Sequence, residues 1–439
     1  MDQPYWSHQD YFIFGADFKN PITNYLDIIK THSKLIFSDY NDLESSLQKI
    51  NNKNYYNTND YIGSKFNIPL TNSFDQLINI THITFGCGFN QPLSNSLDKL
   101  INLNHITFGT NFDQHLANSL DKLINLTHIT FGNNFNQHLA NSLDKLINLT
   151  YLNFGNKFNQ SLTNSLDKLI NLNYLTFGGK FNQPLTNSLD KLINLNYLTF
   201  GGKFNKPLTN SLDKLISLTL ITFSYSFDQP LINSLDKLTN LIHITFGCHF
   251  NKPLYNSLDK LINLTHITFS SRFNQPLANS LDKLINLTHI TLGTYFNQPL
   301  GNSFNRLTNL THLTFCSCFN HPLSNTLYYL TKLEHLTLGY GFDQELILQS
   351  NIKILTLDCK NKNLIENLPN SIEQLNLNKY FNLPLDNLPN SIKVISFDKQ
   401  SEYNCSLNNL PISLEILKLP KHYKKEIKNL SPNCKIIYL

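Results

Sequence analysis

The sequence predicts an α/β repeat solenoid of about twenty turns, in which short parallel strands line a concave face and short helical or 3₁₀ segments return between them. Phenylalanine recurs every 23 residues from Phe66 to Phe342, thirteen times without an insertion. Each unit ends in a stretch that alternates apolar and polar residues, and its middle spaces leucines three residues apart. A unit this short cannot bury its apolar side alone, so the units must stack.

The unit from Phe181 to Lys203, FNQPLTNSLDKLINLNYLTFGGK, shows how the elements follow from the residues. Residues 197–200, Tyr-Leu-Thr-Phe, alternate with period two, which predicts a strand with one buried face, and two glycines then turn the chain. Ser188 can cap a helical turn that carries Asp190 in its first turn. The three-residue leucine spacing fits a short 3₁₀ or α return.

The pattern decays at both ends of the regular array without stopping. Upstream, strand-like segments end at Phe14 and Phe37. Downstream they end at Leu357, Leu377, Phe397, Leu419 and Leu439. We therefore expect degenerate N-terminal capping repeats in 1–61, regular repeats in 62–345, and degenerate repeats with a cap in 346–439, all in one continuous solenoid. The polar outer face of the last turn would come from Lys421, Lys424, Lys425 and Lys428.

The composition favours a surface solvated by amides rather than by ions. Charged residues make up only 15% of the 439 residues, whereas 64 are asparagine. The net charge is +4, and Arg272 and Arg306 are the only arginines. Because nucleic-acid surfaces normally use arginine forks, we expect no nucleic-acid partner.

The sequence also shows no targeting or membrane segment. The N-terminal residues lack a basic region followed by an apolar run, and no stretch approaches 18 uninterrupted apolar residues. We therefore expect an intracellular, cytoplasmic protein that does not contact a membrane.

No constellation of residues predicts catalysis, a metal or a cofactor. The seven cysteines are scattered, and Cys316 and Cys318 form a lone C-x-C without further ligands nearby. The Asp-Lys pair that begins with Asp98-Lys99 recurs in turn after turn, whereas an active site is a singular constellation. We interpret this pair as a solvated face and expect no enzyme activity.

Two asparagine rows are expected to be structural. One follows the repeat phenylalanine from Asn67 to Asn320 and is replaced only by Asp113, Asp228 and Asp343. The other runs from Asn72 to Asn325, one residue before Ser or Thr. Amide side chains in such rows can satisfy the backbone groups of irregular turns.

The candidate binding residues form one row on the concave strand face, just before the buried residue of each strand, beside a row of threonines from Thr84 to Thr337. Tyrosine is a favoured anchor at interfaces, so a partner could dock where tyrosine interrupts histidine. Alternatively, His, Tyr and Thr simply suit a half-exposed strand and were copied by repeat duplication. The row comprises His82, His105, His128, Tyr151, Tyr174, Tyr197, His243, His266, His289, His312 and His335, with Leu220 between its two parts.

The leucine spacing resembles the leucine-rich repeat, most closely in Leu368-Pro369-Asn370-Ser371-Ile372. Residues 66–69 read Phe-Asn-Ile-Pro, and the array resembles the FNIP-repeat proteins of amoebae and of the giant viruses that infect them. The resemblance implies a monomeric, non-enzymatic scaffold for a protein partner, with host proteins among the candidates. Some relatives carry an F-box ahead of the repeats, but here repeat-like sequence begins by Phe14. A self-assembling structural component, a glycan-binding or glycan-acting solenoid and a ubiquitin-ligase substrate arm remain alternatives.

Overall fold

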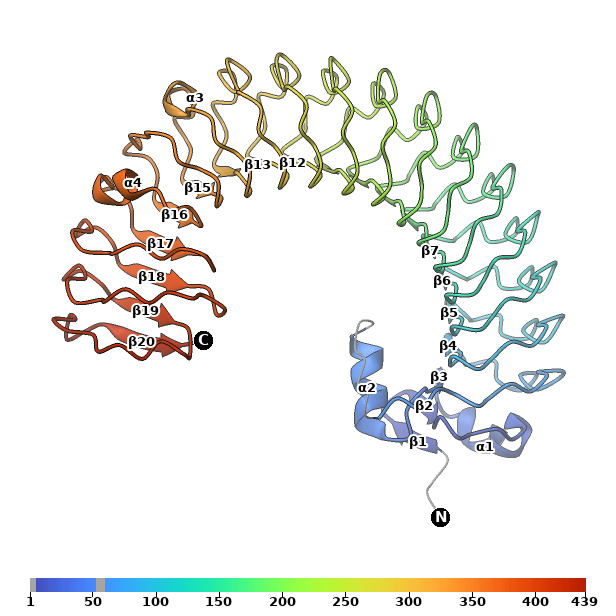
Figure 1. Cartoon of the computed structure of the whole chain (residues 1–439). Coiled ribbons are helices and arrows are strands. Elements are labelled where there is room, and N and C mark those ends of the chain that lie inside the picture. The colour runs from blue at the N-terminus through green and yellow to red at the C-terminus, as the bar shows by residue number, and fades with distance from the viewer. Residues whose placement is uncertain (1–4, 53–59) are drawn as a thin grey trace. The chain divides into compact units, whose positions relative to one another are not determined.

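The computed structural model describes residues 5–52 and 60–439, which form two compact units that meet in sequence between Ser226 and Phe227. In each unit, short strands lie side by side on the inner face and the return segments lie on the outer face (Figure 1). Unit 1 contains β1 (Tyr5–His8), β2 (Tyr11–Phe14), β3 (Lys34–Phe37), β4 (His82–Thr84), β5 (His105–Thr107), β6 (His128–Thr130), β7 (Tyr151–Asn153), β8 (Tyr174–Thr176), β9 (Tyr197–Thr199) and β10 (Leu220–Thr222).

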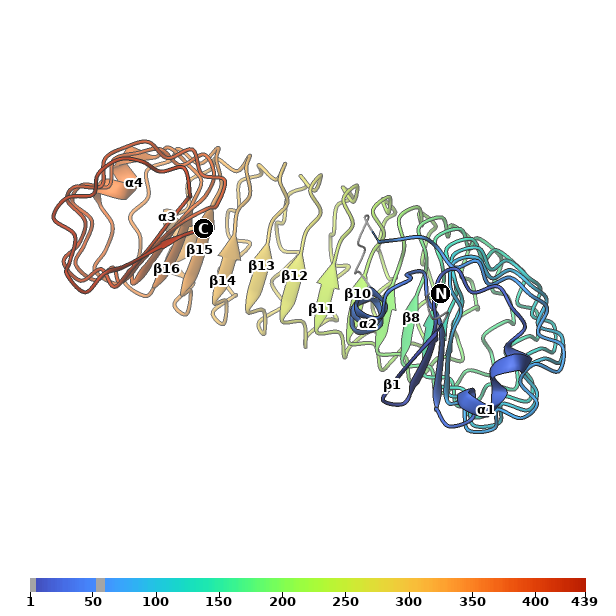
Figure 2. The ribbon, with the colours of Figure 1, turned by 90° about the horizontal axis from the view of Figure 1, so that it is seen from below.

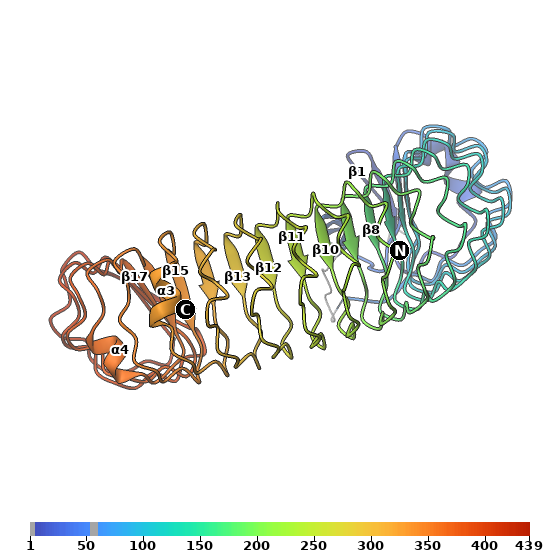
Figure 3. The ribbon, with the colours of Figure 1, turned by 90° about the horizontal axis from the view of Figure 1, so that it is seen from above.

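Unit 2 continues the same pattern, and Figures 2 and 3 show its strands following one another in order. Its final strand ends at Tyr438, one residue before the end that the sequence predicted. The strands are β11 (His243–Thr245), β12 (His266–Thr268), β13 (His289–Thr291), β14 (His312–Thr314), β15 (His335–Leu338), β16 (Ile354–Leu357), β17 (Gln374–Leu377), β18 (Val394–Phe397), β19 (Ile416–Leu419) and β20 (Lys435–Tyr438).

The strands of the regular repeats pair in parallel and in register. His105 lies opposite His128, and Ile106 lies opposite Ile129. The middle residue of each strand is buried and its neighbours are half-buried, so alternate side chains point into the core and onto the inner face. The predicted parallel solenoid with strands on one face is therefore confirmed.

The returns of the regular repeats differ from the expected helices. They are successive turns closed by single bonds such as those from the Leu100 amide to the Leu97 carbonyl and from the Leu103 amide to the Leu100 carbonyl, at 2.9 Å each. Ser188 does not cap a helix, because it is buried and its own amide donates to the Leu185 carbonyl. Asn187 beside it has a φ of 59°, a left-handed conformation that a continuous helix cannot include.

Helices occur only where the pattern is irregular in the described residues. They are the 3₁₀ helix η1 (Ile22–Tyr25), α1 (Leu26–Ile29), α2 (Leu43–Asn51), α3 (Ser324–Tyr328) and α4 (Lys362–Glu366). Of these, α1, α3 and α4 lie on the side of the returns in their own units (Figure 1).

The first strands depart from the regular repeats in two ways. The strand β1 pairs with β2 in antiparallel orientation, whereas β3 pairs with β4 in parallel although 44 residues separate Phe37 from His82. The helix α2, which Asp42 caps through the Ser45 amide, lies within this insertion. The periodic pattern gave no sign of either feature.

The core consists of two stacked columns of phenylalanine and of buried leucines. Along the columns the ring centroids of Phe108 and Phe131 are 5.6 Å apart and those of Phe112 and Phe135 are 6.1 Å apart. Across the columns, Phe108 and Phe112 are 4.1 Å apart. All four side chains are buried, so the phenylalanines of successive repeats form two spines of the core.

The asparagine rows have different roles. In the row after the phenylalanines, the Asn136 carboxamide accepts the Asn159 amide at 2.8 Å, as the predicted ladder requires. In the second row, seven asparagines, Asn187 among them, have positive φ, so their tolerance of the left-handed conformation matters more than a side-chain ladder. A third row links turns instead: Asn125 Nδ2 donates to the Ile101 carbonyl at 2.8 Å.

Candidate functional site

The predicted row occupies the first position of each regular strand, on the inner face of each unit. Its members are half-buried, and Tyr197 is the most open, with 41% of its surface exposed. The parallel register places each residue directly beside the next, as with Tyr151 and Tyr174. The structure therefore brings the predicted residues together within each unit as two continuous rows.

The rings of the unit 1 row stack on one another. The ring centroids of His82 and His105 are 4.1 Å apart and those of His105 and His128 are 3.9 Å apart. The spacing is 4.7 Å between Tyr151 and Tyr174, and 5.9 Å to the tilted ring of Tyr197. Because neighbouring rings cover one another's faces, the row presents mainly ring edges to a ligand.

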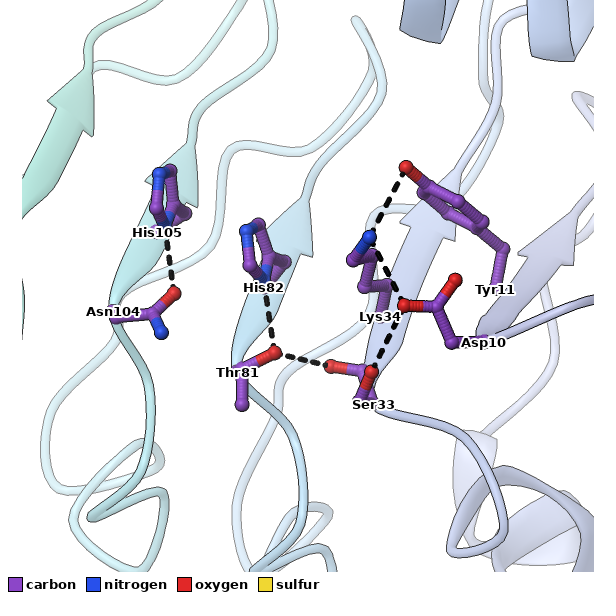
Figure 4. Close-up of polar contacts among 8 residues, drawn as sticks. All are labelled: Asp10, Tyr11, Ser33, Lys34, Thr81, His82, Asn104 and His105. Atoms are coloured by element: carbon purple, nitrogen blue, oxygen red, sulfur yellow. Dashed lines mark hydrogen bonds and ion pairs between the residues drawn. The ribbon is translucent and has the colours of Figure 1, made fainter.

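A polar column one residue before the strands orients the histidines, as Figure 4 shows for two of them. The Asn104 carboxamide oxygen lies 2.6 Å from His105 Nδ1, and Thr81 Oγ1 lies 2.8 Å from His82 Nδ1. The Thr81 hydroxyl donates its single proton to the Ser33 carbonyl at 3.1 Å. In both His82 and His105, Nδ1 must therefore be the hydrogen-bond donor, which leaves Nε2 of the neutral ring as an acceptor.

The unit 2 row repeats this arrangement with histidine alone. Ring centroids from His266 to His335 follow one another at 3.9 to 4.1 Å. Burial, reinforced by the neighbouring imidazoles, lowers the pKa of His266 to about 4. The same causes lower the pKa of His289 and His312, although Glu334 opposes the shift at His312. These histidines are therefore neutral at physiological pH.

Sequence reasoning missed the group that begins the unit 1 row. Lys34 lies beside His82 in the sheet, forms an ion pair with Asp10 at 3.0 Å, and places its ammonium 4.5 Å from the centroid of the Tyr11 ring (Figure 4). Desolvation and the Lys34 charge lower the pKa of His82. The 23-residue period could not reveal this neighbour, because the insertion between β3 and β4 breaks the phase.

A groove of about 850 Å³ lies over the tyrosines of unit 1. Apart from His128, its walls carry only uncharged polar and aromatic side chains. They come from the strands, from the polar column before them and from the third asparagine row. The lining residues are Asn125, Thr127, His128, Asn148, Thr150, Tyr151, Asn171, Asn173, Tyr174 and Tyr197.

A second groove, in unit 2, is charged. It has a volume of about 750 Å³ and lies beside ion pairs between Lys353 and Glu334 at 2.7 Å and between Lys393 and Glu373 at 3.2 Å. All four residues line it, in the column that holds Thr or Asn in the regular repeats. The sign of the charge alternates from strand to strand along this column, so these four charges cancel in pairs.

The described residues lack a cluster of metal ligands, a disulfide and a helix that could span a membrane. Residues 5–52 and 60–439 contain no group of three or more His, Cys, Asp or Glu side chains that could hold a metal ion. Their cysteines are free thiols. None of the helices in this part of the chain is long and apolar enough to traverse a bilayer.

Comparison with known proteins identifies the repeat. The family model for the FNIP Repeat matches residues 361–400, which include the Phe-Asn-Leu-Pro sequence at 381–384. A comparison with curated protein sequences finds no match. The match lies in the degenerate C-terminal repeats and agrees with the resemblance seen in the regular array.

The solved structures that resemble this chain are leucine-rich-repeat proteins. The giant-virus protein CroV588, described as a novel circular LRR protein, is 26% identical with a TM-score of 0.60, and the match covers 99% of this chain and 77% of that one. The Toll–Spatzle complex of Drosophila (14% identity, TM-score 0.55, 95% and 65% coverage) and the TLR13–ssRNA13 complex (13%, 0.54, 97% and 72%) share the fold alone.

Proposed function

We propose that this chain of FNIP-type, leucine-rich-repeat-like turns is a non-enzymatic scaffold that holds a protein partner on the inner face of unit 1. The fold is typically that of an interaction scaffold. The observation that carries the proposal is the coincidence of two features. The groove of about 850 Å³ lies where Tyr151, Tyr174 and Tyr197 replace the histidines of the row.

The chemistry of this groove suits a protein surface. Tyr197 ends the stack, because Leu220 follows it in the sheet, so its ring is open to a partner. The row of phenol groups, threonine hydroxyls and asparagine amides offers hydrogen bonds to backbone and uncharged side chains. Tyrosine adds amphipathic contact area at low entropic cost.

The same groove is poorly suited to a nucleic acid. No lysine or arginine is among its lining residues, whereas binding to a phosphate backbone depends on such cations. The similar structures named above include one complex with a protein ligand and one with RNA. The uncharged lining favours the protein class for this chain, with host proteins among the candidates.

The proposal can be tested by affinity capture from native cells with the intact chain and the double variant Tyr174→Ala, Tyr197→Ala. We expect the variant to fold, because Leu220 shows that the row does not require an aromatic residue, and to lose the proteins that the parent captures. The double variant His289→Ala, His312→Ala in unit 2 is the control and should retain them.

Two outcomes would count against the proposal. Equal capture by the parent and the tyrosine variant would leave repeat duplication as the explanation of the row. Recovery of RNA in place of protein would instead assign the groove to the other ligand class.

A further inference from the structure

A second row on unit 1 is apolar and exposed. In seven consecutive repeats, the isoleucine four residues before the strand has 48 to 55% of its surface exposed. Leucines on either side of it in the sequence, such as Leu100 and Leu103, are fully buried. This isoleucine row consists of Ile78, Ile101, Ile124, Ile147, Ile170, Ile193 and Ile216.

The backbone beneath the row is fixed. Asn102 Nδ2 donates to the Ile78 carbonyl at 2.9 Å, and Asn148 Nδ2 donates to the Ile124 carbonyl at the same distance. At a strand spacing of about 4.8 Å, the seven isoleucines extend over roughly 30 Å. Contiguous exposed apolar patches of more than a few hundred Å² usually mark an interaction site.

The fold itself does not require isoleucine here. In unit 2 the equivalent positions hold Thr239, Ile262, Ile285, Thr308 and Thr331, so the row is interrupted there. Threonine thus occupies the position in turns of the same design. The uninterrupted apolar row is a specific property of unit 1.

The charges beside the row exclude some occupants. Each LDKL sequence places an acid and a lysine just before the isoleucine, as Asp98 and Lys99 precede Ile101. Among the described residues no ion pair joins these two partners, and Lys99 is exposed. In unit 1 six such pairs lie beside the row and Asp75 with Gln76 precedes Ile78, so the band has no excess of positive charge, whereas an anionic membrane or a nucleic acid would select a net positive surface.

We propose that the isoleucine row is a self-association surface at which unit 1 of one chain packs against unit 1 of a second copy. A two-fold axis would run the two rows antiparallel, with Ile147, the central member, near the axis. A second copy of this chain is certain to carry isoleucines at the same spacing as those of the first copy. It also brings its own six Asp-Lys pairs, so charges of both signs face each other across the seam.

The size of the band indicates a reversible dimer. A row about 30 Å long, with the lysine stems and asparagines beside it, offers several hundred Å² per copy, against about 800 Å² for a standard stable interface. The dimer would therefore form with rising protein concentration. This proposal departs from the monomer expected from the sequence, and it rests on exposed isoleucines that are not among the residues lining the tyrosine groove.

Sedimentation of the full chain over a wide range of concentration tests the proposal. The parent should shift from monomer to dimer, and the triple variant Ile124→Thr, Ile147→Thr, Ile170→Thr should remain monomeric. The matched control Ile262→Thr, Ile285→Thr makes the same change in unit 2 and should dimerise like the parent. A parent that stays monomeric, or a triple variant that still dimerises, would overturn the proposal.

A cysteine variant keeps the test informative if the triple variant does not fold. Under mild oxidation, Ile147→Cys should form a disulfide-linked dimer, since each copy would bring this residue to the two-fold axis. Ile78→Cys places the same thiol at one end of the row, where it faces Ile216 of the second copy and not the second thiol. This variant should therefore form little disulfide-linked dimer. Equal crosslinking of both variants, relative to the parent with its native cysteines, would contradict the antiparallel seam.

Discussion

At the residue scale, burial and the neighbouring imidazoles hold His266, His289 and His312 of the unit 2 row in their neutral form. The polar column accepts the Nδ1 proton of a histidine in the row, as Asn104 does for His105. Stacking at 3.9 to 4.1 Å from His266 to His335 makes two adjacent imidazolium ions repel each other. At neutral pH these three rings therefore offer hydrogen-bond acceptors, and in acid their charged forms repel one another.

This arrangement predicts a loss of stability in acid. The pKa of His266 falls from 6.5 to about 4 on folding, so the unfolded chain binds more protons between these two values. The free energy of unfolding should have its full value above pH 6.5 and decrease as the pH falls toward 4. Urea unfolding of the intact chain across this range measures the effect.

Replacing the titrating residues provides the control. The triple variant His266→Tyr, His289→Tyr, His312→Tyr uses the residue that unit 1 already has in this row, and tyrosine does not titrate in acid. Its stability should depend less on pH than that of the parent. Identical profiles would show that the histidine rows do not control the acid response.

At the element scale, each turn after a phenylalanine depends on the turn before it. The Asn136 side chain accepts the Asn159 amide, and the Asn136 amide is itself bound to the Asp113 carboxylate at 2.8 Å. Asparagine and aspartate both supply an acceptor oxygen at this position. The ladder thus explains why the row tolerates Asp113, Asp228 and Asp343 but nothing else in the regular array.

We expect Asn136→Ala to lower the free energy of unfolding by about 1 kcal/mol, because the Asn159 amide would lose its acceptor. Asn136→Asp keeps an acceptor oxygen and should cost clearly less. Comparing the denaturant midpoints of the two variants tests whether the acceptor oxygen at position 136 stabilises the chain. An alanine variant no less stable than the aspartate variant would show that water replaces the ladder without loss.

At the scale of the whole molecule, stability depends on neighbouring turns. The ring of Phe158 stacks on Phe135 and Phe181 in the turns before and after it, at 6.1 and 6.0 Å. Stability in such a stack is approximately a sum of turn and nearest-neighbour contributions. Damage to one turn should therefore weaken its neighbours more than distant turns of the same unit.

Hydrogen exchange of Phe158→Ala should show this gradient. Truncating a buried phenylalanine costs about 3 to 5 kcal/mol, so the amides of β7 and β8 should lose protection. Those of β2 and β3, at the start of unit 1, should remain close to the parent. A uniform loss over all the strands of unit 1 would instead indicate one cooperative block.

The sequence by itself determined the repeat, the strand positions, the phenylalanine spines and the row of His and Tyr. These follow from a 23-residue period, because in a parallel in-register stack the side chains at one repeat position form one row. Local alternation was enough to place Ile106 inside and His105 on the inner face.

Only the tertiary structure decided how those rows interact. The conformation of the returns depends on the left-handed φ at residues such as Asn187, which leucine spacing does not encode. The tautomer of His82 depends on Thr81 and on Ser33, which an insertion separates from it by 49 residues in the chain. The exposure of the isoleucine row was likewise hidden, because burial depends on how successive turns stack, whereas the sequence pattern shows only that these residues are apolar.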